Sequence, residues 1–303
     1  MTADAFELYP DAGIDPQFAN YLREPPRLSY SEPNDPWLSQ FLVTAMENLL
    51  GRRKLEAIYF ALKESRRPAA DFFAGALKAA DISVAYDQAK LQSIPRSGPL
   101  VFVANHPYGI IDGLILCDLA LKARNDMRIM LHSLLCQDRQ FANYFLPIDF
   151  TESREAVKTN IRSKQLALDY LRRDIPVLIF PSGMVSTAGR GGFGEVKDGA
   201  WTTFAAKIIR EANATVIPCY FHGRNSRPFH VLSNIAQPLR TALLLHEAAN
   251  KFGQEVKLEI GDPLPWQEIS HHAGRAELTS FLYQQVQKLG ENGIEMNSAA
   301  AAD

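Results

Sequence analysis

The sequence predicts an α/β fold, with a mostly parallel sheet flanked by helices and an N-terminal helical layer. From about residue 81 onward, short apolar runs alternate with helical patterns, which is typical of parallel sheets. Before that point the chain carries helical patterns and proline breakers only. The 303 residues are 47% hydrophobic and 22% charged, which is the composition of an ordinary globular protein.

The N-terminal part, residues 1–80, is predicted to begin with an irregular lead-in over residues 1–36, where proline and acidic residues are frequent. Apolar residues then recur at helical spacing over 37–50, and a basic run follows. This helix either packs on the core or lies at a membrane interface, with its basic end near anionic headgroups. Further helices are predicted over 53–65 and 69–80.

The α/β domain is predicted over residues 81–290, and a flexible tail over 291–303. Its strands are expected at 82–86, 99–104, 128–132, 176–180, 215–221 and 256–260, and its helices at 110–124, 152–173, 200–212 and 239–252. Residues beyond the carboxyl ends of the strands form the binding site in open sheets of this type.

Charge and cysteine content exclude several classes of protein. A formal net charge of -2 offers no electrostatic argument for a nucleic-acid partner. Cys117, Cys136 and Cys219 lie in apolar stretches without paired spacing, which predicts reduced core residues and neither a disulfide framework nor a zinc site. The N-terminus lacks a secretory pattern and no apolar run is long enough to span a bilayer. We therefore expect a cytoplasmic protein with peripheral membrane contact at most.

The candidate catalytic residues lie where the apolar run 101–104 stops at Asn105 and His106, with Asp112 six residues after the histidine. Residues six apart are about 240° apart on a helix, so His106 is placed in the loop before a helix that holds Asp112 in its first turn. A histidine paired with a carboxylate is a general-base arrangement. The alternative is that His106 caps the loop and Asp112 the helix, and local spacing does not decide between the two.

Two further strand ends carry polar residues. Pro181, Ser182 and Gly183 follow one predicted strand, and His222-Gly-Arg224 follows another. Carboxyl ends of parallel strands meet at one edge of a sheet, so these tips are predicted to converge with His106 on one pocket.

Three other patterns have competing interpretations. The segment 189–196 matches glycine-rich nucleotide-binding loops, but the preceding strand ends near residue 180 and the other kinase motifs are absent. We expect a mobile loop there, with Arg190 and Lys197 facing an anionic ligand. Ser182 suggests a serine hydrolase, although the Gly-x-Ser-x-Gly elbow is missing.

Histidines at three further positions lack the spacing of metal ligands. They are interpreted as loop or surface residues, and no metal site is predicted. These positions are His222, His230 and His246.

Four blocks in order give the chain a family resemblance. They are Asn105-His106 with Asp112, Leu146 to Arg154, Phe180 to Gly183, and Val216 to Pro218. Over about residues 80–265 the sequence resembles glycerolipid acyltransferases of the lysophosphatidic acid acyltransferase type, and most of all their bacterial hemolysin-like or lyso-ornithine-lipid branch. Five residues separate His106 from Asp112, as in that branch.

The chain departs from the family pattern in two blocks. Phe150 stands where many relatives carry an arginine, and Ser182 replaces the usual third-block glutamate. Met184 occupies the place where the branch often has a glutamate. The missing acid keeps a non-catalytic lipid- or acyl-carrier-binding protein open as an alternative.

The resemblance implies an enzyme that moves a fatty acyl group from acyl carrier protein or coenzyme A to a hydroxyl of a lysolipid, either a lysophospholipid or a lyso-ornithine lipid. It implies no cofactor beyond this cosubstrate, and peripheral association with the inner membrane. His106 would be the base and Asp112 its orienting acid. The substrate-binding residues it implies are Asn105, Gly109, Arg154, Pro181, Ser182, Gly183, Arg190 and Arg224.

Overall fold

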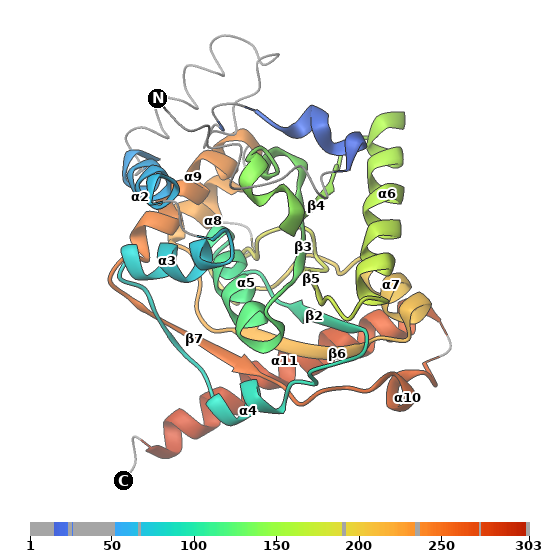
Figure 1. The fold of residues 1–303 in the computed structure, drawn as a ribbon. Helices are drawn as coiled ribbons and strands as arrows, with labels where there is room; N and C mark the ends of the chain where they lie inside the picture. The colour runs from blue at the N-terminus through green and yellow to red at the C-terminus, as the bar shows by residue number, and fades with distance from the viewer. Residues whose placement is uncertain are drawn as a thin grey trace.

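A seven-stranded sheet with the order β1-β7-β6-β2-β5-β3-β4 forms the centre of the computed structural model (Figure 1). The structure describes residues 15–23, 26, 52–65, 68–189, 192–233, 237–272 and 274–300. The strands are β1 (Ser83–Ala85), β2 (Leu100–Ala104), β3 (Arg128–His132), β4 (Phe145–Ile148), β5 (Val177–Ile179), β6 (Thr215–Phe221) and β7 (Glu255–Ile260). Neighbouring strands pair in parallel except β6 and β7, which are antiparallel. The predicted mostly parallel sheet is confirmed.

Helices cover both faces of this sheet. The α-helices of the described residues are α2 (Arg52–Glu64), α3 (Asp71–Ala79), α4 (Gln88–Ser93), α5 (Ile110–Arg124), α6 (Arg154–Leu171), α7 (Phe204–Ala212), α8 (Arg227–Ser233), α9 (Gln237–Asn250), α10 (Trp266–Ile269) and α11 (Arg275–Ala300). The 3-10 helices are η2 (Pro16–Tyr21), η3 (Ser133–Leu135) and η4 (Arg139–Tyr144).

Strand β2 lies between two hydrophobic layers and is fully buried. Its Phe102 packs in one layer with Ile111 and Ile115 of α5. Val101 and Val103 point the other way, into a layer that α6, α7 and α11 complete. Alternation with period two along a strand, with apolar residues on both faces, is what a central parallel strand requires. Figure 1 shows the helices that lie around β2.

Helices α2 and α3 correspond to the predicted N-terminal helices, and α3 is part of the main core. Phe73 and Leu77 of α3 belong to the same buried cluster as Phe102. The predicted helix over 37–50 and most of the predicted lead-in lie outside the described residues. Within the lead-in, η2 replaces the expected irregular chain because Asp15 caps it by accepting from the amide of Gln17.

Several elements were not predicted. Strand β4 is four residues long and contains Pro147, so it lies at the edge of the sheet and gives a weak sequence pattern. Helices α4, α8, α10 and α11 were also missed. Helix α11 continues to Ala300, so the predicted boundary at residue 290 falls inside a helix.

The three cysteines are buried and form no disulfide, as predicted from their apolar surroundings. Burial raises the pKa of the thiols of Cys117, Cys136 and Cys219, so these groups remain protonated. None of the helices among the described residues is long and apolar enough to cross a membrane.

Candidate active site

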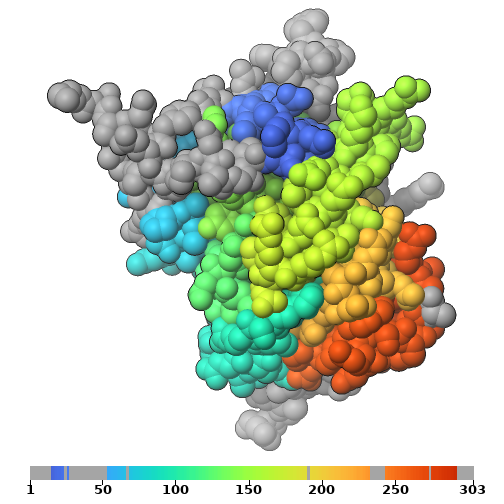
Figure 2. Space-filling model, turned by 45° about the vertical axis from the view of Figure 1, so that its right-hand side comes forward, coloured from blue at the N-terminus to red at the C-terminus, as the bar shows by residue number. Residues whose placement is uncertain are grey.

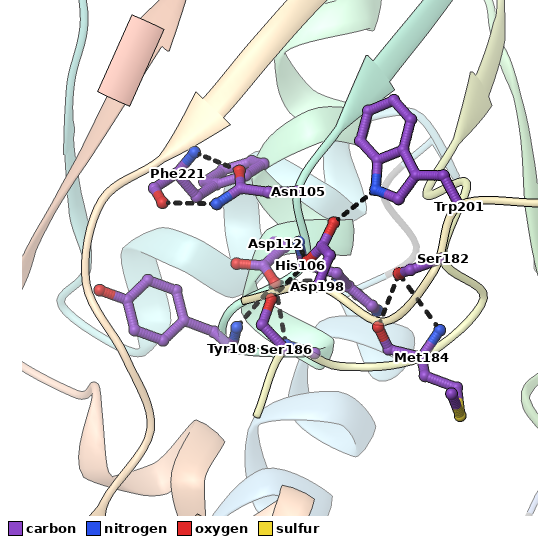
Figure 3. A network of polar contacts seen from close by, with 11 residues as sticks. Asn105, His106, Tyr108, Asp112, Ser182, Met184, Ser186, Asp198, Trp201 and Phe221 are labelled. Atoms are coloured by element: carbon purple, nitrogen blue, oxygen red, sulfur yellow. Dashed lines mark hydrogen bonds and ion pairs between the residues drawn. The ribbon is translucent and has the colours of Figure 1, made fainter. Parts of the chain in front are cut away.

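The turn after β2 is tied to the neighbouring strand by Asn105. Its buried side chain donates Nδ2–H to the carbonyl of Phe221 (3.0 Å), and its Oδ1 accepts from the amide of Phe221 (2.7 Å). The side-chain amide of Asn105 thus extends the pairing of β2 with β6 one residue beyond β2 (Figure 3). Both polar ends of Asn105 are occupied, so its described contacts are structural ones.

His106 and Asp112 form the predicted pair. Nδ1 of His106 lies 3.0 Å from Oδ2 of Asp112. The same oxygen accepts from the amides of Tyr108 (2.8 Å) and Gly109 (2.9 Å), so the carboxylate closes the turn on itself. Because a carboxylate only accepts hydrogen bonds, Nδ1 carries a proton, and Nε2 is the ring nitrogen left to take up another.

Asp112 is fully buried and lies in the first turn of α5. Burial raises the pKa of this carboxyl, whereas the hydrogen bonds from His106, Tyr108 and Gly109 lower it. The positive end of α5 adds to the stabilisation of the charged form. The side chain of His106 is 17% exposed, so in this pair the acid is closed off from solvent and the base is accessible to it.

The tip of β6 meets the same turn. The buried Tyr108 donates its hydroxyl hydrogen to the carbonyl of His222 (2.6 Å), and the ammonium of Lys251 lies 4.6 Å from its ring centroid. Burial raises the pKa of Tyr108, so its hydroxyl stays a neutral donor. The strand ends of β2 and β6 therefore converge as predicted.

The tip of β5 lies on the other side of His106. The ring of Phe180 stacks on the imidazole, with centroids 4.0 Å apart and planes at 23°. Beyond it, Gly183 donates its amide hydrogen to the carbonyl of Phe180 (2.9 Å), and Thr202 donates its own to Pro181 (3.0 Å). The predicted third block is thus next to the candidate base.

Ser182 does not approach that base through a hydrogen bond. Its side chain is buried, and its hydroxyl donates to the carbonyl of Met184 (2.8 Å) within the same turn (Figure 3). In the part of the chain that the structure describes, no hydrogen bond joins Ser182 to a histidine.

The candidate headgroup arginines occupy different places. Arg154 is exposed at the start of α6, and Arg224 is exposed after β6. Arg190 falls outside the described residues. Among the described contacts, none joins Arg154 or Arg224 to His106, so binding of a headgroup by these side chains stays a prediction.

Phe150 connects the second block to the third. A Cβ on Gly183 would lie 2.9 Å from the Phe150 ring, so this ring lies directly over Gly183. The two blocks in which the sequence departs from the family pattern therefore touch each other.

Sequence reasoning missed Asp198. Its Oδ1 accepts from the amide of His106 (3.1 Å) and from the hydroxyl of Ser186, and its Oδ2 accepts from the indole of Trp201 (2.8 Å). The residue follows a glycine-rich segment and is far from His106 in the sequence, so no local spacing indicates the contact. Lys197 pairs with Glu195 (2.8 Å) on the surface, and its expected contact with an anionic ligand stays a prediction.

His230 corrects another expectation. It is fully buried, and its Nδ1 accepts from the amide of Ala188 (3.2 Å), whereas a loop or surface position was expected. The missed helix α8 is the reason, since this helix turns His230 inward. Among the described residues, no group of three potential metal ligands occurs.

Comparisons with known proteins find relatives that match most of the chain. A lyso-glycine lipid O-acyltransferase from Phocaeicola vulgatus is 29% identical over 262 residues, covering 84% of this chain and 89% of the relative. A protein of the same name from Bacteroides thetaiotaomicron is 26% identical over 265 residues, covering 84% and 91%. The crystal structure of the 1-acyl-sn-glycerophosphate (LPA) acyltransferase PlsC from Thermotoga maritima is 17% identical, with a TM-score of 0.49 and coverage of 84% and 89%.

The family model of acyltransferases matches residues 38–292 and so extends well beyond the four blocks on both sides. This match spans most of the chain and includes the turn that holds His106 and Asp112 as well as the altered third block. The chain therefore belongs to the acyltransferase family and is an enzyme of acyl transfer.

Proposed function

We propose that this enzyme transfers a fatty acyl group from a thioester to a hydroxyl of a lysolipid, with His106 as general base. The observation that carries the proposal is the 3.0 Å contact between Nδ1 of His106 and Oδ2 of the buried Asp112. It lies at the end of β2, where the tips of β5 and β6 also meet.

The chemistry follows from this arrangement. Nε2 of His106 takes the proton of the acceptor hydroxyl while the oxygen attacks the thioester carbonyl carbon, forming the new C–O bond. The C–S bond then breaks, and the imidazolium returns the proton to the leaving thiolate. Asp112 holds the ring in the required tautomer and stabilises the imidazolium. The reaction needs no acyl-enzyme intermediate.

The names of the two relatives support a lysolipid acceptor with a glycine headgroup. A lyso-ornithine lipid and a lysophospholipid are the competing acceptors. All three carry an anionic group, for which the exposed Arg154 and Arg224 offer charge-assisted hydrogen bonds. We keep both acyl carrier protein and coenzyme A as donors.

A serine hydrolase is disfavoured by Ser182 itself. A nucleophilic serine needs a base within hydrogen-bond reach, but this hydroxyl donates to the carbonyl of Met184. A purely binding protein is disfavoured by the intact pair of His106 and Asp112.

The test supplies the purified enzyme with acyl-CoA or acyl carrier protein thioester and, in turn, with each of the three lysolipids. Released thiol and acylated product are measured together, in the wild type, in His106→Ala and in His271→Ala, an exposed histidine that serves as control. Acceptor-dependent product in the wild type and the control, and none in His106→Ala, is the expected result.

Three outcomes would contradict the proposal. Transfer retained by His106→Ala removes the general base. Thiol release without acceptor, together with an acyl group trapped on Ser182, indicates a hydrolase. Lysolipid binding without thiol release from either donor indicates a binding protein.

Peripheral contact with the inner membrane is part of the proposal, and the outer face of α6 supports it. Val157 and Ile161 are 56% and 52% exposed, one turn apart on this helix. Figure 2 shows α6 uncovered at the surface beside η2. Arg154 and Lys158, also exposed, are one turn apart on the same side. Apolar and cationic side chains on one face suit an anionic lipid surface.

Flotation with liposomes tests this contact. The wild type is expected to float with anionic vesicles more than with neutral ones, because the cations add to the apolar contact. The double variant Val157→Glu/Ile161→Glu should lose flotation, whereas Val231→Glu, at another exposed apolar position, should keep it. Absence of wild-type flotation on both vesicle types would contradict membrane contact through this face.

A further inference from the structure

We propose that Asp198 is a positioning residue for acyl transfer: it holds the main chain of His106, as Asp112 holds its ring. The inference rests on the proposed function, because it gives Asp198 a role only if His106 is the base. It adds a second carboxylate to the site, contributed by a segment outside the four family blocks.

The first observation is a closed set of hydrogen bonds around His106 (Figure 3). Its amide donates to Oδ1 of Asp198 (3.1 Å), and its carbonyl accepts from the amide of Ser186 (2.8 Å). The hydroxyl of Ser186 donates to the same Oδ1 of Asp198. Both main-chain polar groups of His106 are therefore bound by residues that follow the third block.

The second observation is that Asp198 is itself anchored. Its Oδ2 accepts from the indole nitrogen of Trp201 (2.8 Å), and that indole packs edge-on against Tyr283 of α11, with centroids 5.5 Å apart. The carboxylate thus connects the candidate base to the long C-terminal helix.

The third observation explains why Ser186 and Asp198 meet. The adjacent residues Thr187 and Lys197 form an antiparallel bridge, with N–H···O distances of 3.0 and 3.2 Å. The bridge closes the glycine-rich segment into a loop whose two ends lie side by side at His106. The segment 189–196, whose pattern resembles a nucleotide-binding loop, is thus closed at the point where Ser186 and Asp198 bind the main chain of His106.

The physical need for this support is local. Strand β2 ends at Ala104, so the amide and carbonyl of His106 have no partners in the sheet, and buried main-chain groups require partners. Asp112 and Phe180 orient the ring, but their contacts place Nε2 correctly only if the main chain is also fixed. A displacement of about 1 Å at a reacting group can lower a rate about 100-fold.

Substitutions separate the bonds of Asp198. Asp198→Ala removes all three, and we expect kcat to fall about 100-fold with unchanged KM for donor and acceptor. Asp198→Asn keeps one oxygen that can still accept from His106 and Ser186 and loses only the bond from Trp201. We expect this variant to lose less than about tenfold, so the conservative change rescues most of kcat.

Asp126→Ala is the matched control. Asp126 also accepts one main-chain amide, that of Met127 (2.8 Å), and one side-chain donor, that of Arg128 (2.6 Å). Asp126 precedes β3, whereas His106 follows β2. Asp126 therefore lies at the amino end of the parallel strands and His106 at their carboxyl end. The loss of Asp126 should lower the melting temperature while leaving kcat unchanged.

A spectroscopic measurement separates positioning from general stability. The proton on Nδ1 of His106 is observed by nitrogen-15 NMR in the folded wild type, in Asp198→Ala and in Asp126→Ala. We expect its signal to broaden or shift in Asp198→Ala only, because the ring then no longer meets Asp112 at one fixed distance.

The outcomes keep the two proposals distinct. Transfer retained by His106→Ala overturns the proposed function. If His106→Ala abolishes transfer but Asp198→Ala keeps the wild-type kcat, or loses no more than Asp126→Ala does, only the positioning role is overturned. A fall in kcat confined to Asp198→Ala, with a changed Nδ1 signal and recovery in Asp198→Asn, supports it.

Discussion

The turns after β2 and β5 start from neighbouring positions and are built in different ways. Val103 and Ile179 pair in the sheet, so both turns leave the same edge side by side. In the first, the side chains of Asn105, His106 and Asp112 all bind fixed partners. In the second, the hydroxyl of Ser182 binds only its own turn.

The surroundings of the second turn are apolar. Phe150 lies over Gly183 and is 54% exposed, and Met184 is 50% exposed. In the proposed mechanism proton transfer belongs to the first turn, and the second turn supplies the Phe180 ring that stacks on His106 and an apolar rim. We therefore expect the third block, which lacks its glutamate, to contact the apolar part of a lysolipid.

The largest expected effect is on the first turn. Asp112→Asn should lower kcat about 10⁴-fold, by analogy with the acid of a serine protease triad, because the amide cannot stabilise the imidazolium. The amides of Tyr108 and Gly109 still find an oxygen to bind, so the fold should remain. Kinetics and thermal unfolding measured on the same preparation check this, and a loss below tenfold would contradict the pairing.

The second prediction compares the glycines of the two turns. Gly109 has φ of 87° and ψ of -102°, and a Cβ there would lie 3.1 Å from Leu244 and Val185. Gly183 has φ of 65°, a left-handed value that costs alanine about 1–2 kcal/mol, and the Phe150 ring that it would meet is 54% exposed, so few neighbours oppose a shift of this ring.

Gly109→Ala should therefore lower kcat about 100-fold, since it displaces the amides that hold Asp112, and Gly183→Ala less than tenfold. The ratio of the two kcat values, at equal fraction folded, is the measurement. Equal losses would show that the second turn contributes as much to the reaction as the first.

Ser182→Ala should have a smaller effect. It removes one neutral hydrogen bond within a turn, worth about 1 kcal/mol of stability, and leaves His106 in place. We expect kcat within about tenfold of the wild type and a slightly lower melting temperature. Abolished transfer in a folded Ser182→Ala protein would return the chemistry to the second turn.

The smallest effect is expected at His222, which follows β6, the third strand whose end meets at the site. Burial, with a contribution from Lys257, lowers the pKa of His222 below its usual 6.5. As the pH falls through about 6.5, the unfolded chain takes up this proton before the folded one does, so the free energy of unfolding decreases. The variant His222→Gln has no imidazole to titrate, so its free energy of unfolding does not decrease for this reason. The stability difference between wild type and variant, measured by denaturant unfolding from pH 7.5 to 5, should shift against the wild type on acidification, and a constant difference contradicts it.

Local patterns predicted the parts of the site that are close in sequence. The buried strand and the helix over 110–124 follow from apolar spacing, and the six-residue step places His106 in the loop before that helix. The pairing of His106 with Asp112 was one of two interpretations that local spacing left open, and the structure shows the pair. The convergence of three strand tips followed from a rule about parallel sheets. These features need only short-range information or a general topology.

The missed features depend on where distant segments pass. Asp198 follows a glycine-rich loop and binds the amide of His106. Glycines allow many backbone conformations, so the sequence does not determine where this loop brings Asp198. His230 is buried because α8 packs against the rest of the domain. Strand β4 was missed because it is too short to give a clear alternating pattern and contains a proline. Contacts of this kind arise from tertiary packing, and no local spacing predicts them.

The pairing of β1 with β7 has a consequence for the order of folding. Ser83 pairs with Glu255, so the first of the described strands finds its neighbour only after the other described strands have been made. During synthesis β2 to β6 can associate while β1 is still unpaired and β6 keeps an open edge. We expect this edge to be the last part of the sheet to gain protection from hydrogen exchange and the point where nascent chains are most exposed to aggregation.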